Sequence, residues 1–293
     1  QRLSRGLGDV YKRQHLYDLS TKHLNNYGIN INGEINLDLN KMMKNKESVV
    51  NKLTSGISSL FKKNKVTYLH GEAKITGSNS VAIDSNTFKA KTILISTGSV
   101  PSTISNVKVD EKNIVSSTGA LDFSEVPRNL AVIGGGYIGL ELGSVWKRLG
   151  SNVTVIEFSP NIVPTMDKDT AEIFFKTLKR QGLKFLMSTA VESANKEKDK
   201  ISLTCLNNIN NTRTNLVFDK VLVAVGRKPY HKGLGLEELN IKLNKDNTID
   251  VDSDFRTSVP SIYAIGDVIQ GPMLAHKASA EGHIFACLLY TSD

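Results

Sequence analysis

The feature that most constrains this chain is a glycine-rich corner between an apolar segment and a helical one. Residues 130–133 are continuously apolar and predict a buried strand, which runs into three consecutive glycines at 134–136. A helical pattern follows over residues 137–149, and a second strand is expected at residues 152–156. The chain therefore predicts a βαβ unit whose first turn is made of glycine.

This corner has the spacing with which proteins bind a dinucleotide. Gly134 would permit the tight turn, Gly136 would let a pyrophosphate approach the backbone, and Gly139 would let the helix lie close to the strand. The helix N-terminus would offer N–H groups to the phosphates. Glu157, 18 residues after Gly139, ends the second strand at the place of a ribose-binding carboxylate. A corner that binds no nucleotide is the alternative.

The residues after Glu157 bear on which dinucleotide is bound. They are Phe158, Ser159 and Pro160, so no Arg or Lys follows the carboxylate. A carboxylate would repel a 2′-phosphate, and no neighbouring cation is present to attract one. The sequence therefore favours NAD over NADP.

The composition narrows the class of protein. The net charge is +8, but Lys and Asn are scattered along the chain, and no cluster of basic and aromatic residues predicts a nucleic-acid interface. The chain holds two cysteines, Cys205 and Cys287, without the spacing of a zinc site or a disulfide framework. No apolar run reaches the roughly 18 residues that a membrane span requires, and no secretory pattern is visible. We therefore expect no metal, no nucleic acid and no membrane as partners.

Both ends differ in pattern from the rest of the chain. Residues 1–14 and 287–293 resemble translated adapter sequence, and we expect both to be non-native termini of an internal fragment. Apolar spacings of three and four predict helices, and a spacing of two predicts strands. Helices are expected at 15–26, 38–64 and 167–181, and strands at 66–69, 73–76, 80–83, 92–96 and 184–187. Residues 100–123 are expected to be a linker, and residues 191–218 a β-meander.

Two segments of the chain repeat one design. Residues 91–101 and 220–229 each read as Lys, an apolar strand, a small residue, Gly and then Pro. A third strand, at residues 262–265, delivers Gly266 and Asp267, and a helix is expected to start near Pro272. An Asp at the carboxyl end of a strand can accept hydrogen bonds from ligand hydroxyls. These repeats predict two nucleotide-binding domains of similar design. His276 could be a base, although a packing or capping histidine is the favoured interpretation.

These motifs resemble those of the dihydrolipoamide dehydrogenases, within the pyridine-nucleotide disulfide oxidoreductase family. The segments that carry the resemblance are GGGYIGLELGSVWKRLGSNVTVIEF (134–158), VLVAVGRKP (221–229), IYAIGDVIQGPMLAHKASAEG (262–282), ILISTGSVP (93–101) and VSSTGAL (115–121). The likeness extends over about residues 15–286. It implies an α/β fold in which an NAD-binding, Rossmann-like domain (127–250) is inserted into a partial FAD-binding domain (15–126 and 251–286), with β-meanders.

The resemblance also implies the site residues. NAD would be cradled by Gly134, Gly135, Gly136, Tyr137, Ile138, Gly139, Leu140 and Glu141, with Glu141 beside the nicotinamide. Glu157 would hold the adenosine ribose, and Val191 and Gly226 would line the NAD cleft. For FAD, Ala73 would make a backbone contact, and Asp267 would bond the ribitol. The diphosphate and adenine side would be near Thr97, Gly98 and Ser99, and the flavin ring would face Met273, Leu274, Ala275 and His276.

The activity implied is electron transfer from dihydrolipoamide through FAD to NAD. The implied partner is the lipoyl-bearing acyltransferase of a 2-oxoacid dehydrogenase complex, and the implied state is a homodimer in the bacterial cytoplasm or the mitochondrial matrix. A mercuric or glutathione reductase-type enzyme and a non-catalytic nucleotide-binding module are the alternatives.

The departures from the family pattern concern the thiol chemistry. The family's first G-x-G-x-x-G, its C-x4-C redox disulfide and its C-terminal His–Glu pair have no counterpart, and Cys205 matches no redox position. No catalytic residue is therefore predicted. We expect the isolated chain of 293 residues to bind NAD weakly, to hold FAD poorly and to show no lipoamide activity.

Overall fold

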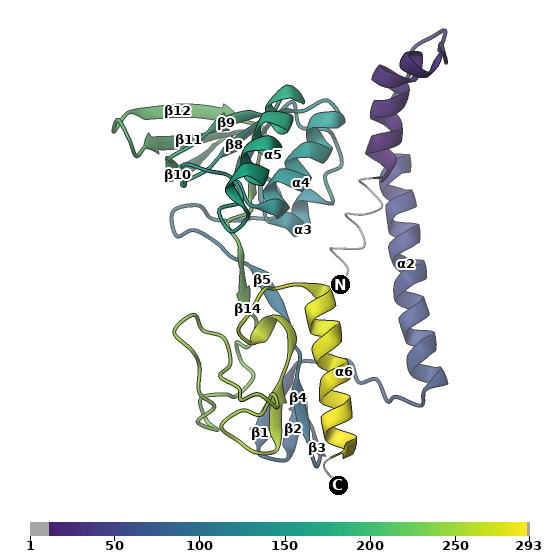
Figure 1. The fold of residues 1–293 in the computed structure, drawn as a ribbon, viewed down its shortest axis with the longest axis vertical. Coiled ribbons are helices and arrows are strands. Elements are labelled where there is room, and N and C mark those ends of the chain that lie inside the picture. Colours follow the sequence, from purple (N-terminus) through teal and green to yellow (C-terminus); the bar gives the residue numbers. More distant parts are fainter. Residues whose placement is uncertain (1–11, 292–293) are drawn as a thin grey trace. The chain divides into compact units, whose positions relative to one another are not determined.

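The computed structural model describes residues 12–291, and their contacts form two compact units. The first unit takes Gln1–Asn64 and Pro101–Gly226, and the second takes Lys65–Val100 and Arg227–Asp293. Figure 1 shows the chain coloured along its sequence and labels many of the helices and strands of both units. Each unit has its own hydrophobic core and is described by itself.

A five-stranded parallel sheet forms the centre of the first unit. Its order is β6-β13-β7-β8-β9, made of Ile114–Val115, Lys220–Val223, Asn129–Ile133, Asn152–Ile156 and Lys184–Leu186. The strands predicted at 130–133, 152–156 and 184–187 are confirmed. The linker predicted at 100–123 is wrong, because this segment contains β6 and the short helix α3 (Ser117–Ala120). A strand of two residues is too short to show a periodic pattern.

Two helices of the first unit begin and end where their capping residues predict. Helix α4 is Tyr137–Arg148, and α5 is Lys168–Arg180. The Asp167 carboxylate caps α5 by accepting from the Thr170 N–H at 2.9 Å, and the hydrogen bonds from Thr170 lower the pKa of Asp167. Both predicted helices are confirmed, because their end signals lie in the local sequence.

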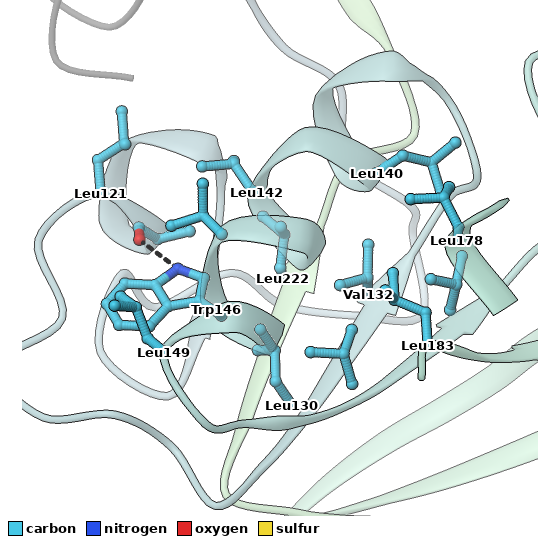
Figure 2. Packing of buried hydrophobic residues seen from close by; sticks show 14 of the residues in the cluster. Leu121, Leu130, Val132, Leu140, Leu142, Trp146, Leu149, Leu178, Leu183 and Leu222 are labelled. Carbon is cyan, nitrogen blue, oxygen red and sulfur yellow. Dashed lines mark hydrogen bonds between the residues drawn. The ribbon is translucent and has the colours of Figure 1, made fainter. Parts of the chain in front are cut away.

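Alternate side chains of β7 enter two different cores. Leu130 and Val132 lie in a cluster with the α4 residues Leu142 and Trp146, which Figure 2 shows. The Trp146 indole donates to the Ala120 carbonyl at 3.0 Å, so the one polar atom of this side chain is satisfied. The intervening residues of β7 belong to a second cluster, which includes side chains of strand β11 (Lys200–Asn207). The sheet is therefore buried on both faces, as a parallel sheet requires.

That second face is covered by an antiparallel β-meander. Its strands are β10 (Thr189–Glu197), β11 (Lys200–Asn207) and β12 (Arg213–Phe218). Ile201, Leu203 and Phe218 of the meander pack against Val221 and Val223 of the sheet. The predicted meander and the α/β fold class are confirmed.

The first unit also holds the long helix α2 (Leu39–Lys63). Its predicted limits are confirmed, since Asp38 accepts from the Lys41 N–H at 2.9 Å and Asn64 is its C-cap. Buried Lys46 attaches the helix to α3 by donating to the Leu121 carbonyl at 2.8 Å. The helix predicted at 15–26 is also confirmed: residues 12–18 are helical, followed by η1 (Leu19–His23) and η2 (Leu24–Tyr27).

The second unit contains three small sheets. Strands β1 (Ala73–Gly77), β2 (Ser80–Ile83) and β3 (Asn86–Lys89) are antiparallel. The strand predicted at 66–69 is wrong, since this exposed segment pairs with no strand of the described chain. Strand β3 was not predicted, because all four of its residues are exposed and show no alternation.

The other two sheets bring distant segments together. Strand β4 (Ile93–Ile95) is parallel to β15 (Ile262–Ala264), and β5 (Ser99–Pro101) pairs with β14 (Arg227–Pro229). A short 3-10 turn, η3 (Gly266–Val268), and helix α6 (Ala275–Thr291) follow β15.

The compact units and the predicted domains have different limits. Residues 227–250 were predicted to belong to the NAD-binding domain, but Leu236, Ile241 and Ile249 lie in the core of the second unit. Residues 1–11 of the predicted N-terminal segment lie outside the described residues, and residues 287–291 continue α6. Whether the two termini are native, and where the nucleotide-binding domains begin and end, stay predictions.

Candidate functional site

A cleft of about 900 Å³ lies in the first unit, at the carboxyl ends of β7, β8 and β13. This is the edge at which open parallel sheets bind ligands. Phe158, Met166 and Val225 are among its apolar lining residues. Seven of the predicted NAD-binding residues line it: Gly134, Gly136, Tyr137, Ile138, Glu157, Val191 and Gly226.

The turn at the base of this cleft requires glycine at two positions. Gly134 has a φ of +107°, and a Cβ there would lie 2.4 Å from the Ala224 carbonyl oxygen. A Cβ on Gly139 would lie 2.4 Å from the carbonyl oxygen of Gly134. In contrast, a Cβ on Gly136 would meet no protein atom within 4 Å. The space beside Gly136 is therefore open to a ligand.

The Glu157 carboxylate is held in place by backbone groups. Its Oε2 accepts from the Gly135 N–H at 2.5 Å, and its Oε1 accepts from the Ser159 N–H at 2.7 Å. Each oxygen retains a lone pair for a ligand hydroxyl. Glu157 is also the one charged side chain among the described residues that line the cleft. The cleft thus offers an acceptor for ribose hydroxyls and no cation for a 2′-phosphate.

Four of the predicted NAD-binding residues do not line the cleft. Gly135, Gly139 and Leu140 are buried beneath it and shape the turn. Glu141 lies on α4, does not line the cleft, and is exposed to solvent. Partial desolvation of its carboxyl raises the pKa of Glu141 above the ordinary value.

A second corner, in the second unit, follows the parallel strands β4 and β15. Because these strands lie side by side, residues 97–99 and Gly266-Asp267 meet at their carboxyl ends. The Ser99 hydroxyl donates to Asp267 Oδ2 at 2.5 Å. Thr97 donates to the Tyr230 carbonyl, and the Tyr230 N–H donates to the Gly98 carbonyl at 2.9 Å.

The backbone at this corner is tied to helix α6. The Gly266 N–H donates to Glu281 Oε2 at 2.7 Å, and Lys277 Nζ donates to the Gly266 carbonyl at 3.2 Å. Lys277 and Glu281 also form an ion pair at 2.9 Å, with side chains only 18% and 12% exposed. The peptide groups just before Asp267 are therefore fixed on both sides.

The remaining predicted FAD-binding residues lie near the start of an element. Ala73 begins β1 and is exposed. Met273 is half-buried before the first turn of α6, whereas Leu274, Ala275 and His276 are exposed there. His276 is consequently outside the core of the second unit.

The glycine turn and this paired-strand corner agree with the comparisons with known proteins. Residues 11–282 match the family described as pyridine nucleotide-disulphide oxidoreductase. The chain belongs to this family. The predicted resemblance is thereby confirmed.

Relatives in this family include dihydrolipoyl dehydrogenases. The mitochondrial dihydrolipoyl dehydrogenase of Dictyostelium discoideum is 48% identical over 275 residues, which are 92% of this chain and 56% of that protein. The mitochondrial enzyme of Pisum sativum is 44% identical over 281 residues, which are 94% of this chain and 56% of that protein. A leghemoglobin reductase from Vigna unguiculata is 46% identical over 273 residues, covering 92% and 52%. The chain spans about half the length of these relatives.

The solved structures agree on the fold. The HOCl-induced flavoprotein disulfide reductase RclA from Escherichia coli superposes with a TM-score of 0.80 at 22% identity, over 96% of this chain and 60% of that one. This similarity supports the mixed α/β architecture.

Two residues that form hydrogen bonds at the Asp267 corner of this chain were not predicted from the sequence. Arg227 and Glu281 lie within the motifs that carry the family resemblance, but the resemblance implies no role for them. The only local signal for Arg227 was its place directly after the repeated strand and glycine.

Cys205 has the surroundings of a packing residue. It is buried among meander and sheet side chains. Burial, together with the Glu192 carboxylate, raises the pKa of the Cys205 thiol to about 11. Within residues 12–291, no cluster of three His, Cys, Asp or Glu side chains could hold a metal ion. The helices of the same range are too short or too polar to span a bilayer.

Proposed function

We propose that this chain provides the NAD-binding site and part of the FAD-binding site of a dihydrolipoamide dehydrogenase. The whole protein would pass electrons from dihydrolipoamide through FAD to NAD. The observation that carries the proposal is the cleft beside Gly136, in which Glu157 is the one charged lining residue. Relatives with this name are 48% and 44% identical to the chain.

The residues of the cleft fit a bound NAD. The open space at Gly136 would admit a pyrophosphate, and the first N–H groups of α4 would be available to its phosphates. Glu157 would accept from the adenosine ribose, and the apolar lining residues would limit the access of water. When bound, the nicotinamide would accept a hydride from reduced flavin. The protein's part is to bind and orient this group.

The corner of the second unit fits the polyhydroxyl part of FAD. Asp267 Oδ1 accepts no hydrogen bond from the described residues, so it is available to a ribitol hydroxyl. Thr97, Gly98 and Ser99 lie beside it. The further contacts with FAD that the resemblance implies for Ala73 and residues 273–276 belong to the same proposal.

The partner and the location follow from the same assignment. The dithiol substrate would be the lipoyl group on the acyltransferase of a 2-oxoacid dehydrogenase complex, and the enzyme would be a homodimer. Dihydrolipoyl dehydrogenases named as mitochondrial are among the relatives. The mitochondrial matrix is therefore the proposed location.

A non-catalytic nucleotide-binding module is the second candidate function for the chain of 293 residues itself. Cys205 favours it, because a buried thiol with a pKa of about 11 forms little thiolate at neutral pH. A glutathione reductase-type enzyme is disfavoured by the absence of Lys and Arg among the described lining residues of the cleft.

The first test is the affinity of the chain for NAD, measured by calorimetry with NADP as the comparison. Gly136→Ala places a methyl group in the open space and should lower NAD affinity at least about tenfold, a loss of about 1.4 kcal/mol. The Tm should be unchanged, since Gly136 has a φ of −77° that alanine adopts readily. Gly56→Ala, in an equally open position on α2, is the control. Equal NAD affinities for Gly136→Ala and the unsubstituted chain would contradict the proposal.

The second test concerns catalysis. The full-length gene product should reduce NAD with dihydrolipoamide, followed by NADH absorbance. The chain of 293 residues should not. Measurable turnover by this shorter chain would contradict the expectation that, without the family's redox disulfide, it has no lipoamide activity.

A further inference from the structure

Asp267 is joined to a three-membered hydrogen-bonded relay that begins at Arg227. Arg227 Nε donates to the Ser99 hydroxyl at 2.7 Å, and this hydroxyl donates to Asp267 Oδ2 at 2.5 Å. All three residues are half-buried. They come from three separate segments of the second unit.

The relay has one direction only. A guanidinium N–H cannot accept a hydrogen bond, so the Ser99 oxygen must accept from Arg227. The hydroxyl has a single proton, which must then point to Asp267. Arg227 therefore fixes the rotation of the Ser99 hydroxyl, and Ser99 fixes one oxygen of the carboxylate.

Arg227 also holds the backbone of the same residue. A second guanidinium nitrogen donates to the Ser99 carbonyl at 2.6 Å. The planar fork thus contacts Ser99 at two points, which a lysine ammonium on a flexible stem would not reproduce. Ser99 is consequently fixed at its hydroxyl and at its peptide group.

We propose that Ser99 and Arg227 are positioning residues that hold the Asp267 carboxylate in the orientation in which it accepts from a flavin ribitol hydroxyl. This inference rests on the proposed function, because it assumes that FAD binds at this corner. It assigns Ser99 a role through Asp267, in addition to the position near the diphosphate and adenine side of FAD that the resemblance implied. Arg227 gains a role that no motif had given it.

The competing explanation is that these hydrogen bonds only stabilise the turn between β4 and β5 and do not act on FAD binding through Asp267. The two explanations differ in whether Ser99 acts through the carboxylate. If it does, the cost of removing the hydroxyl must disappear when the carboxylate is already absent. If it does not, the two losses add, as they do for independent sites.

The experiment measures the FAD dissociation constant of the full-length gene product by recovery of flavin fluorescence. Ser99→Ala should weaken FAD binding about tenfold, as expected for a hydrogen bond to a charged group. Ser99→Thr keeps the hydroxyl and should restore binding to within about twofold. Ser261→Ala is the matched control, since Ser261 donates to the Ser78 carbonyl at 2.6 Å just before β15, at the end opposite Asp267.

A double-mutant cycle with Asp267→Ala completes the test. In the Asp267→Ala background, Ser99→Ala should change FAD affinity by less than about twofold. Arg227→Lys gives an independent measurement and should weaken binding about fivefold. The Tm of the FAD-free protein should be the same for Ser99→Ala and Ser261→Ala.

The outcomes separate the inference from the proposed function. Failure of the unsubstituted full-length protein to bind FAD would overturn the proposed function. Normal FAD binding, with Ser99→Ala equal to Ser261→Ala or with additive losses in the cycle, would overturn the positioning role alone. Loss of binding in Ser99→Ala, rescue by Ser99→Thr and a vanishing effect without Asp267 would support it.

Discussion

The glycine corner of the first unit and the Asp267 corner of the second follow parallel strands of similar design, but different groups fix their geometry. At the first corner, two positions lack a side chain, because backbone carbonyl oxygens lie too close for a Cβ at Gly134 and Gly139. At the second corner, side chains fix the geometry. Arg227 and Ser99 hold the Asp267 carboxylate, and Glu281 accepts from the Gly266 N–H just before it.

This difference matches the chemistry of the polar groups in the two proposed ligands, NAD at the first corner and FAD at the second. A pyrophosphate is an acceptor that backbone N–H groups at a helix N-terminus can bind. A ribitol hydroxyl is also a donor and requires a fixed acceptor. The comparison indicates that the first corner depends on close backbone approach and the second on the hydrogen bonds that orient Asp267.

The largest effect expected is at the backbone of the first corner. Gly139→Ala should lower the free energy of unfolding by about 3 kcal/mol or more, because the new Cβ would lie 2.4 Å from a carbonyl oxygen. Gly143→Ala, on the same helix, meets its nearest atoms at 3.4 Å and should change stability by less than about 1 kcal/mol. Urea denaturation of both variants measures the contrast. Equal losses would show that close approach does not distinguish the two positions.

The next largest effect is expected in the reactivity of the two cysteines toward a thiol reagent. Cys205, in the first unit, has a thiol pKa of about 11, whereas Cys287, on α6, is exposed. At neutral pH the Cys205 thiolate should be about a hundredfold rarer than that of an ordinary cysteine. Labelling with a thiol reagent should modify Cys287 first and Cys205 only after denaturation. Rapid native labelling of Cys205, read by mass spectrometry, would contradict the buried packing role.

The ion pair that holds the second corner should matter more than an exposed pair of the same spacing. Glu281→Gln should cost about 1–2 kcal/mol of stability, because Glu281 is only 12% exposed and accepts from the Gly266 N–H. Glu172→Gln removes the matching pair with Lys176 on α5, where Glu172 is 57% exposed, and should have a clearly smaller effect on stability because solvent screens the pair. Thermal denaturation compares them. A larger loss in Glu172→Gln would invert the comparison.

The smallest effect expected depends on pH. The pKa of Glu141 is raised in the folded protein, so its ionisation opposes folding as pH rises through that pKa. Glu141→Gln should therefore be relatively more stable at pH 7 than at pH 3, by about 0.5 kcal/mol or less, since the residue is exposed. Denaturant midpoints at the two pH values measure this difference. An advantage for the variant at acidic pH would show that the sign is wrong.

Much of the fold could be predicted because its signals are local. Helix α2 is bounded by Asp38 and Asn64, and β2 and β8 show the alternation or apolar run of buried strands. Strand β6 escaped prediction because two residues carry no period, and β3 because both of its faces are exposed. Residues 66–69 have strand-like composition, but no described strand pairs with them.

The candidate sites divide in the same way. The glycine corner lies within one short stretch of sequence, so its geometry could be predicted from spacing. The hydrogen bonds that join Ser99 to Arg227 and to Asp267 span 128 and 168 residues of sequence, and these residues meet because β5 pairs with β14 and β4 lies beside β15. A single sequence shows the strands but not this pairing, and the relay could not be predicted.

Strand β7 has a consequence for how this protein can change in length. Its alternate residues pack into two separate hydrophobic clusters. A residue inserted before Leu130 would therefore turn each side chain of the strand toward the opposite cluster. By contrast, the loop between β11 and β12 carries Ile209, which is 78% exposed, and can lengthen without moving a buried side chain. Insertions and deletions among relatives should therefore collect at this loop and be absent from the strand that leads into the glycine corner.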